Sequence, residues 1–343
     1  MPQLLPILKS SPVITRYPTP VLSKKDVPYE ASLVFNAGVV KYNGKYVMMF
    51  RNDFGCNSDE EYMERIEKNL PGVAGTDLGL ALSDDGIHWA VTEKPFMAYK
   101  DMFKYKDVLR FYDPRLTVID NELYMCFAID THHGIRGGIG KIHNLETLEI
   151  LTMTAPDNRN MVLFPEKING KYVRLERPFP VYGNCGKDKF DTWISSSPDM
   201  RYWGDTELLL AVEDVPFAND KLGPAAPPIK TEKGWLTTFH AVDIDTTRGK
   251  NGWGPSWPKR YSAGIMLLDL ENPYKIIGYS KEPLLAPESF YETDMDVYRS
   301  NVIFPGGMIL EDDGEVKIYY GASDTFECLA TANVNDLIDL CLK

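Results

Sequence analysis

The residues with the clearest chemical potential are one aspartate and a group of basic side chains. Asp113 stands in the segment Tyr-Asp-Pro-Arg, and Arg159, Arg177, Lys221 and His240 follow it along the chain. A carboxyl group beside several cations is typical of an acid next to an anion site, because guanidinium forks bind phosphate well and lysine acts as a point charge. Inverting hydrolysis needs a second carboxylate to activate water, whereas phosphate is already a nucleophile. The combination therefore fits a phosphate-using reaction.

Each of these residues also has an ordinary structural interpretation. Asp113 could open a turn, because Asp-Pro often does so, and we expect Arg115 to pair with it or with a neighbouring strand. Arg51 and Asp53 could form an ion pair between sheets, and Asp324 could cap a turn. The residue types alone therefore do not select one catalytic group.

Patterns typical of metal sites do not occur in this sequence. The 5 histidines show no HxH or HExxH spacing, and the 5 cysteines form no CxxC pair. We therefore expect no metal centre and no disulfide framework.

The whole chain has 343 residues and a formal net charge of −12. That charge argues against a broad nucleic-acid-binding face, although a local basic pocket for a small anion is compatible with it. The N-terminus lacks a basic region before a long apolar run, and no segment is long enough to span a membrane. With the sparing use of cysteine, these features favour the cytoplasm and no membrane partner.

A repeated unit, a strand followed by a tight turn and a second strand, predicts the architecture. Asn-Gly and Asp-Gly pairs between apolar runs are strong hairpin signals. Five tight turns are expected, three of them with such a pair: Asn43-Gly44, Asp120-Asn121, Asn169-Gly170, Lys233-Gly234 and Asp313-Gly314. Further strand-like runs lie between the hairpins, and few helical patterns interrupt them. Five units of three or four strands predict a single-domain, all-β, five-bladed β-propeller, with a β-sandwich as the alternative.

The propeller is expected to occupy residues 31–332. Residues 1–30 are rich in proline and are expected to form an extension that packs on the propeller. Two helices are expected, at Glu60–Asn69 within an insertion spanning 54–75 and at Asn335–Leu342 within a C-terminal segment, 333–343.

Polar residues at the ends of apolar strands are expected to converge in one funnel, because the inner strands of a propeller meet at its axis. We expect one set of them just before the inner strands: Asn36, Tyr112, Asp113, Arg115, Arg159, Asn160, Lys221 and Asn301. The returning strands contribute a second set: Arg51, Asp53, Asp130, Arg177, His240, Asp243 and Asp324. Trp253 and Trp257 could stack on sugar faces or pack between blades.

In these segments the sequence resembles glycoside hydrolase family 130, the β-mannoside phosphorylases. The similar segments span nearly the whole chain in order: 34–51, 112–120, 158–178, 191–204, 221–242, 261–273, 301–309 and 319–325. The resemblance implies a five-bladed propeller, as the repeats do. It also implies inorganic phosphate as co-substrate, with no other cofactor.

The resemblance further implies roles for individual residues. Asp113 is similar to the family's general acid, which acts through the 3-hydroxyl of the bound mannose. The residues that resemble the family's phosphate-binding set are Arg159, Arg177, Lys221, His240 and Tyr261. The residues that resemble those in contact with the sugar are Asn36, Tyr112 and Asp324. We add Arg51 to the sugar-binding group because of its position at the rim.

The expected activity is inverting phosphorolysis of a β-mannoside, a β-1,4-manno-oligosaccharide or mannosyl-glucose, to α-mannose 1-phosphate. A β-1,2-mannobiose or oligomannan phosphorylase, a β-mannoside hydrolase and a non-catalytic carbohydrate-binding propeller are the alternatives. The sequence departs from the common family pattern after Lys221 and around His240, and the 54–75 insertion has no clear counterpart. The acceptor, the linkage and the oligomeric state, a homo-oligomer included, therefore stay open.

Overall fold

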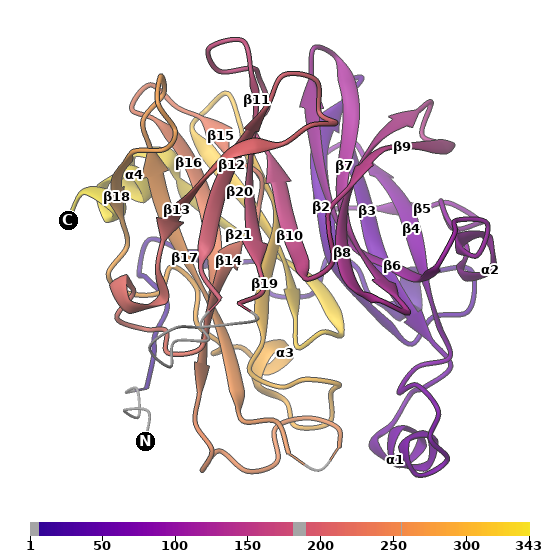
Figure 1. Ribbon diagram of the computed structural model, residues 1–343. Coiled ribbons are helices and arrows are strands. Elements are labelled where there is room, and N and C mark those ends of the chain that lie inside the picture. Colours follow the sequence, from indigo (N-terminus) through magenta and orange to yellow (C-terminus); the bar gives the residue numbers. More distant parts are fainter. Residues whose placement is uncertain (1–6, 181–189, 255) are drawn as a thin grey trace.

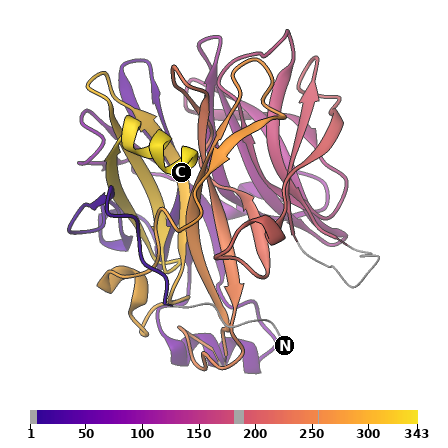
Figure 2. The ribbon, with the colours of Figure 1, turned by 90° about the vertical axis from the view of Figure 1, so that its left-hand side faces the viewer.

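The computed structural model of the chain describes residues 7–180, 190–254 and 256–343. Within these ranges the strands form five antiparallel sheets around a common axis (Figure 1, Figure 2). The predicted five-bladed β-propeller is confirmed.

The first three blades follow one another along the chain, each with four strands. Blade 1 contains β2 (Leu33–Tyr42), β3 (Lys45–Phe54), β4 (Gly75–Ser83) and β5 (Ala90–Val91). Blade 2 contains β6 (Val108–Ile119), β7 (Glu122–Thr131), β8 (Gly134–His143) and β9 (Thr147–Met153). Blade 3 contains β10 (Asn158–Leu163), β11 (Tyr172–Pro178), β12 (Thr192–Ser197) and β13 (Gly204–Leu210).

The last two blades depart slightly from this order. Blade 4 contains β14 (Lys221–Pro224), β15 (Ile229–Lys230), β16 (Trp235–Ile244), β17 (Lys259–Leu268) and β18 (Ile276–Tyr279). Blade 5 contains β19 (Ile303–Leu310), β20 (Glu315–Ala322), β21 (Phe326–Asn333) and, from the other end of the chain, β1 (Thr15–Arg16).

The predicted hairpin turns are confirmed in all five blades. In blade 1, for example, Tyr42 pairs with Lys45 across Asn43 and Gly44, which both have positive φ. The inner two strands of blades 1, 2 and 3 are therefore joined by the type of turn that Asn-Gly favours, with positive φ at both central residues.

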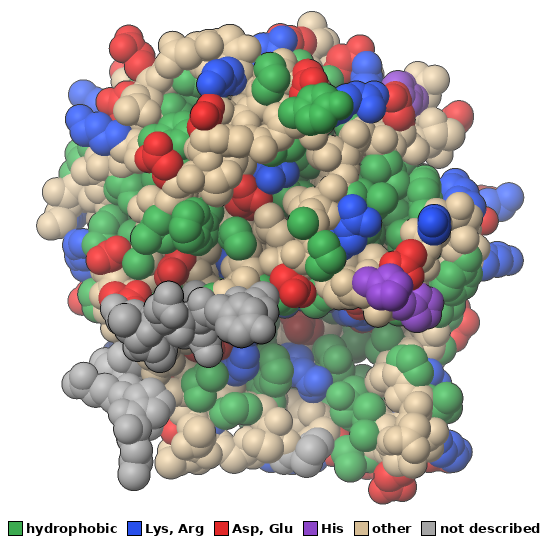
Figure 3. All heavy atoms as spheres, viewed as in Figure 1, with side chains coloured by type: hydrophobic (Ala, Val, Ile, Leu, Met, Phe, Trp, Pro, Cys, Tyr) green, Lys and Arg blue, Asp and Glu red, His purple; other side chains and the backbone are tan. Residues whose placement is uncertain are grey.

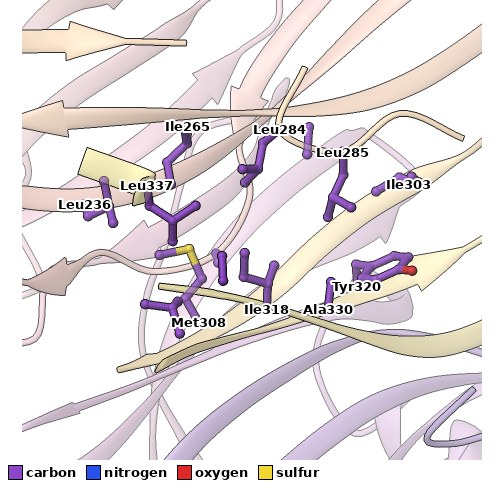
Figure 4. Close-up of a cluster of buried hydrophobic side chains, with 14 of the residues drawn as sticks. Leu236, Ile265, Leu284, Leu285, Ile303, Met308, Ile318, Tyr320, Ala330 and Leu337 are labelled. Atoms are coloured by element: carbon purple, nitrogen blue, oxygen red, sulfur yellow. The ribbon is translucent and has the colours of Figure 1, made fainter. Parts of the chain in front are cut away.

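The hydrophobic core is divided into clusters between neighbouring blades, because each sheet buries both of its faces. The largest cluster joins blades 4 and 5, where Leu236 and Ile265 meet Ile303 and Ile318 (Figure 4). Similar clusters lie between the other neighbouring pairs of blades. Each blade thus stabilises the next, and the inner strand ends are held in fixed positions around the axis.

The N-terminal segment completes the last blade. Thr15 and Arg16 in β1 pair with Thr331 and Ala330 in β21. The Arg16 guanidinium also donates to both oxygens of Glu292, at 2.8 and 3.1 Å, and this carboxylate is fully buried. Pairing between the two ends of the chain therefore closes the ring.

The helices are short and lie outside the blades. They are α1 (Asp59–Glu67), α2 (Tyr99–Met102), α3 (Phe290–Thr293) and α4 (Val334–Leu342), with 3₁₀ turns at Lys24–Asp26 and Val212–Asp214. The two predicted helices are confirmed as α1 and α4, with small shifts at their ends. The helix α1 and the loop between β16 and β17 project from the same end of the propeller (Figure 1, Figure 2).

Candidate active site

The inner strands of blades 1, 2 and 3 each contain an Asn or Asp at a bulge. Asn36, Asp113 and Asn160 have positive φ angles of 53°, 52° and 57°. The pairing register of each strand shifts at that point. Non-glycine residues rarely adopt positive φ, and Asn and Asp do so most readily. A bulge re-aims side chains, so it brings these polar groups to the axis.

This arrangement corrects part of the sequence-based expectation. We expected Asn36, Asp113 and Asn160 to precede their strands, but each strand begins before the bulge and continues after it. Lys221 likewise lies within its strand, β14. Asn301 does precede β19.

Side chains from all five blades line a pocket of about 290 Å³ at the end of the propeller from which α1 projects. Figure 3 shows a hollow near this end of the molecule, with Lys and Arg side chains visible inside it. Eight of the ten predicted site residues line the pocket: Asn36, Arg51, Tyr112, Asp113, Arg159, Arg177, Tyr261 and Asp324. Asn36 and Asp324, which are 288 positions apart in the sequence, therefore share one site.

Asp113 lies in a positively charged setting. Its Oδ1 accepts a hydrogen bond from Asn36 Nδ2 at 3.1 Å and lies 3.4 Å from Arg51 Nη1. Burial alone would raise the pKa of Asp113, but the charges of Arg51, Arg115 and other cations outweigh it and lower that pKa. In the free chain Asp113 is therefore a carboxylate at neutral pH.

Arg51 is itself held by a second carboxylate. Asp53 accepts from Arg51 Nη2 at 2.6 Å and from Arg51 Nε at 3.0 Å. The Thr76 hydroxyl donates to the same carboxylate at 2.6 Å. Asp53 is buried in blade 1, so it fixes the guanidinium that contacts Asp113.

Asp324 is a third carboxyl group, and its environment differs from that of Asp113. Burial raises its pKa to about 6, with the negative charge of Asp113 adding to the increase and Arg51 opposing it. Its φ is 49°, so it also lies on a sharply turned backbone segment. The pocket thus contains two carboxyl groups with pKa values moved in opposite directions.

Arg159 and Arg177 form the most unusual feature of the pocket. They are direct partners across β10 and β11, and both guanidiniums lie over the ring of Phe179, at 5.6 and 5.4 Å. Like charges in directly opposed positions are unfavourable. Among the described residues, nothing accepts a hydrogen bond from Arg159 Nε or from Arg177 Nε and Nη2, although these atoms are buried.

The pKa of Arg177 reflects this lack of a negative partner. Burial and the neighbouring charge of Arg159 lower it from 12.5 to about 9. A buried cation pair with unused donors is costly unless an anion binds between them. The pair is therefore a candidate anion site.

The structure places His240 behind this pair and outside the pocket lining. Its Nε2 lies 3.1 Å from Arg177 Nη1, and the ring is fully buried. Burial and the nearby Arg177 and Arg159 charges lower the pKa of His240, so the neutral ring accepts from Arg177 and supports it. Gly223 is required here, because a Cβ would lie 2.8 Å from His240 Nε2.

Lys221 also lies outside the pocket lining, close to the cationic group. Its ammonium is 4.6 Å from the centre of the Phe190 ring and near Lys259. Burial and the charge of Lys259 lower its pKa. Lys221 therefore lies among the same basic groups, and its lowered pKa reflects their crowding.

The pocket also contains residues that the sequence-based interpretation missed. Arg110, Tyr298, Arg299 and Phe304 line it, together with Trp257, which we had named only as a possible stacking residue. Arg110 pairs with Asp130 at 2.6 Å, and this carboxylate accepts from the Tyr112 hydroxyl at 2.9 Å. Asp130 was among the residues expected at the rim, whereas Arg110, two positions before Tyr112, was not named.

Arg115 has the structural role that we expected. Its guanidinium donates to the backbone carbonyls of Ala225, Asn36 and Pro114, at 2.8, 3.1 and 2.7 Å. These carbonyls belong to blades 4, 1 and 2, so Arg115 ties three blades together below the bulge that carries Asp113.

In the described ranges, no group of three or more His, Cys, Asp or Glu residues is arranged to hold a metal ion. Four cysteines, Cys56, Cys126, Cys328 and Cys341, are free and buried, and Cys185 lies outside the described residues. None of the described helices is long and apolar enough to cross a membrane.

Comparisons with known proteins agree with this geometry. A family model described as β-1,4-mannooligosaccharide phosphorylase matches residues 9–343. The chain is 31% identical over 339 residues to the β-1,4-mannooligosaccharide phosphorylase of Ruminococcus albus, covering 95% of this chain and 90% of that protein. It is 30% identical over 335 residues to a β-1,2-mannobiose phosphorylase of Listeria innocua, covering 87% and 88%.

Solved structures give the same result. The structure of β-1,2-mannobiose phosphorylase from Listeria innocua, in complex with β-1,2-mannobiose, matches with a TM-score of 0.78 and 26% identity. The match covers 96% of this chain and 99% of that one.

Proposed function

The chain belongs to glycoside hydrolase family 130, and from this premise we propose that it cleaves β-mannosides with inorganic phosphate, inverting the anomeric centre to give α-mannose 1-phosphate. The observation that carries the proposal is the Arg159–Arg177 pair, whose unused donor atoms are buried. Guanidinium forks of this kind match the oxygens of phosphate.

In the proposed reaction, Arg159 and Arg177 bind phosphate and aim one oxygen at the anomeric carbon. The bond from that carbon to the leaving sugar breaks as the new bond forms on the opposite face. Asp113 supplies the proton that the leaving sugar requires, through the neighbouring hydroxyl or directly. Asn36 and Arg51 orient Asp113 by the contacts described above.

Phosphate binding and protonation of Asp113 should favour each other. The positive charges around Asp113, Arg159 among them, lower its pKa in the free chain. An anion bound at Arg159 opposes that effect, so it raises the pKa of Asp113. Asp113 is then protonated most readily when phosphate, the nucleophile of the reaction, is bound.

The remaining pocket residues are assigned to the mannosyl ring and to phosphate. Tyr112 and Asp324 contact the ring, and Tyr261 contacts phosphate, since these side chains line the same pocket. His240 supports Arg177, and Lys221 adds positive charge nearby. In the reverse direction the enzyme would act as a glycosyltransferase. The free, buried cysteines among the described residues support a cytoplasmic location.

Hydrolysis is the second candidate, because Asp113 and Asp324 share the pocket and have pKa values moved apart. Such pairs occur in acid–base catalysis. A hydrolase, however, has no use for two buried guanidiniums that lack an anion. We therefore favour phosphorolysis.

A substrate panel tests the proposal. The chain is incubated with β-1,4-mannobiose, β-1,2-mannobiose or mannosyl-glucose, each with and without phosphate, and the anomer of the product is identified by NMR. We expect α-mannose 1-phosphate from at least one substrate. Formation of β-mannose 1-phosphate would contradict the inverting mechanism.

A further inference from the structure

The insertion after β3 packs behind one wall of the pocket, where its Tyr62 contacts the lining residues Tyr298 and Arg299. Its helix, α1, begins with Ser58, whose hydroxyl accepts from the Glu61 backbone N–H. No residue of α1 is buried, so the helix contributes little to the core. The contacts that this helix makes with other parts of the chain therefore need an explanation other than core packing.

Asp59 attaches α1 to the loop that blade 4 contributes. Its Oδ1 accepts from the Gly254 backbone N–H at 2.8 Å, and its other oxygen pairs with Lys250. Gly254 has a φ of 83°, and a Cβ at this position would lie 3.1 Å from the Tyr62 ring. A glycine is thus needed where the loop meets the helix.

Tyr62 extends the contact from α1 to blade 5. Its hydroxyl accepts from Arg299 Nη2 at 3.3 Å, and its ring meets the Tyr298 ring edge to face at 5.8 Å. Arg299 Nη1 donates to the backbone carbonyls of Trp253 and Tyr298, at 3.0 and 2.9 Å. Segments from blades 1, 4 and 5 therefore fix this one guanidinium.

Aromatic rings complete the wall. The Arg299 guanidinium lies 4.1 Å from the centre of the Tyr298 ring and 4.8 Å from that of Trp257. On its other side Trp257 stacks on Tyr261, with 6.3 Å between ring centres and 4° between planes. Arg299, Trp257 and Tyr298 all line the pocket. Core packing does not explain a cation held at that surface by segments from three blades.

The Arg299 end of the wall lies on the carboxylate side of the pocket, and its Trp257 end reaches Tyr261. The Arg299 backbone N–H donates to the Ser323 carbonyl at 3.1 Å, directly before Asp324, whereas Arg159 and Arg177 lie in blade 3. In an inverting displacement the nucleophile and the leaving group occupy opposite faces of the anomeric carbon. With phosphate at Arg159 and Arg177, the leaving sugar is expected at the other side.

We propose that Arg299 and Trp257, held in place by Tyr62 of α1, bind the sugar that leaves during phosphorolysis and so determine which acceptor the chain uses. The inference rests on the proposed function. The ligand is a neutral hexopyranose, whose hydroxyls accept from the guanidinium and whose ring packs against the indole.

The test uses the reverse reaction, with α-mannose 1-phosphate as donor and mannose or glucose as acceptor. Arg299→Lys keeps the charge but removes the planar fork, and we expect it to raise the acceptor KM about tenfold or more, as loss of a charge-assisted hydrogen bond does. Tyr62→Phe removes only the hydroxyl that accepts from Arg299, and we expect about a threefold rise. The KM for α-mannose 1-phosphate should not change in either variant.

Arg65→Lys is the matched control. Arg65 lies in the same helix, but its Nε donates to the Pro71 carbonyl and not to the wall. This variant should keep both KM values and the preference between mannose and glucose. An unchanged acceptor KM in Arg299→Lys, or equal rises in the acceptor and donor KM values, would overturn the inference.

Failure of the proposed function would be recognised separately, on the wild-type chain. If that chain does not use α-mannose 1-phosphate and releases mannose without phosphate, the proposed function is wrong. The same variants are then compared in hydrolysis of β-mannobiose. A disaccharide KM that rises in Arg299→Lys supports the inference, and an unchanged KM overturns it.

Discussion

Replacing Arg177 by Met should make the free protein more stable and abolish tight phosphate binding. Arg177 is fully buried, and its Nε and Nη2 have no acceptor among the described residues. Methionine fills a similar volume without a charge. Replacing a functional group that is unfavourable in the ligand-free protein typically lowers the activity and raises the stability.

The magnitude follows from the lowered pKa. Burial and Arg159 move the pKa of Arg177 from 12.5 to about 9. At about 1.4 kcal/mol per pKa unit, the charged form costs the folded state up to about 5 kcal/mol. The guanidinium is charged in both folded and unfolded chains below pH 9, so this cost is constant between pH 5 and pH 8. Lost contacts with His240 and Phe179 will offset part of the gain.

Arg174, on the same strand, provides the matched control. It is also buried, but its Nη2 lies 2.8 Å from Glu176 Oε2 and its Nε donates to Ser195. Arg174→Met leaves Glu176 as an unpaired buried charge, which typically costs about 3–5 kcal/mol. Two buried arginines three positions apart should thus respond with opposite signs.

Urea unfolding and thermal melting with and without phosphate measure both effects. Phosphate at a hundred times its Kd should stabilise the wild-type chain by about 2.7 kcal/mol and Arg177→Met hardly at all. If Arg177→Met were destabilised as strongly as Arg174→Met, or if phosphate stabilised it as it does the wild type, the anion-site argument would be refuted.

Three further predictions concern other groups. Asp113→Asn should lower kcat by about 10²- to 10⁴-fold while the fold, checked by circular dichroism, is kept; a wild-type rate would remove Asp113 from the mechanism. Asp324, whose pKa burial raises to about 6, should bind the sugar hydroxyls most strongly when it is ionised, because charge-assisted hydrogen bonds are the stronger ones, so kcat/KM should fall below about pH 6. Asp324→Asn should lose this acidic limb, and an unchanged pH profile would count against the role. Glu292→Gln should destabilise the fold by about 3–5 kcal/mol in urea, since it removes the buried partner of Arg16 and Tyr320; a change below 1 kcal/mol would argue against ring closure by this pair.

The sequence was sufficient for the architecture because the signals were local. Turns such as Asn43-Gly44 are determined by residues that tolerate positive φ, and each turn defines a hairpin wherever it lies. Five such hairpins indicated five blades. Asn36 and Asp113 were located only approximately, because their bulges depend on the register between paired strands.

The site was harder to predict where several blades supply its parts. Tyr261 came only from resemblance to a family. Arg299 was missed because its partners Tyr62 and Trp253 lie in helix α1 and in the β16–β17 loop, which belong to two other blades. His240 was correctly associated with the basic group, but its position behind Arg177 depends on Gly223 and on packing across blades. Contacts between distant segments leave no periodic signal in a sequence.

Phosphate dependence of bond cleavage tests the central claim most directly. Cleavage of β-1,4- and β-1,2-mannobiose is followed while the phosphate concentration is raised from zero, with mannose 1-phosphate and free mannose quantified separately. The account predicts a saturable dependence and one mannose 1-phosphate for each bond cleaved. Cleavage at the same rate without phosphate, with both sugars released as free mannose, would contradict it.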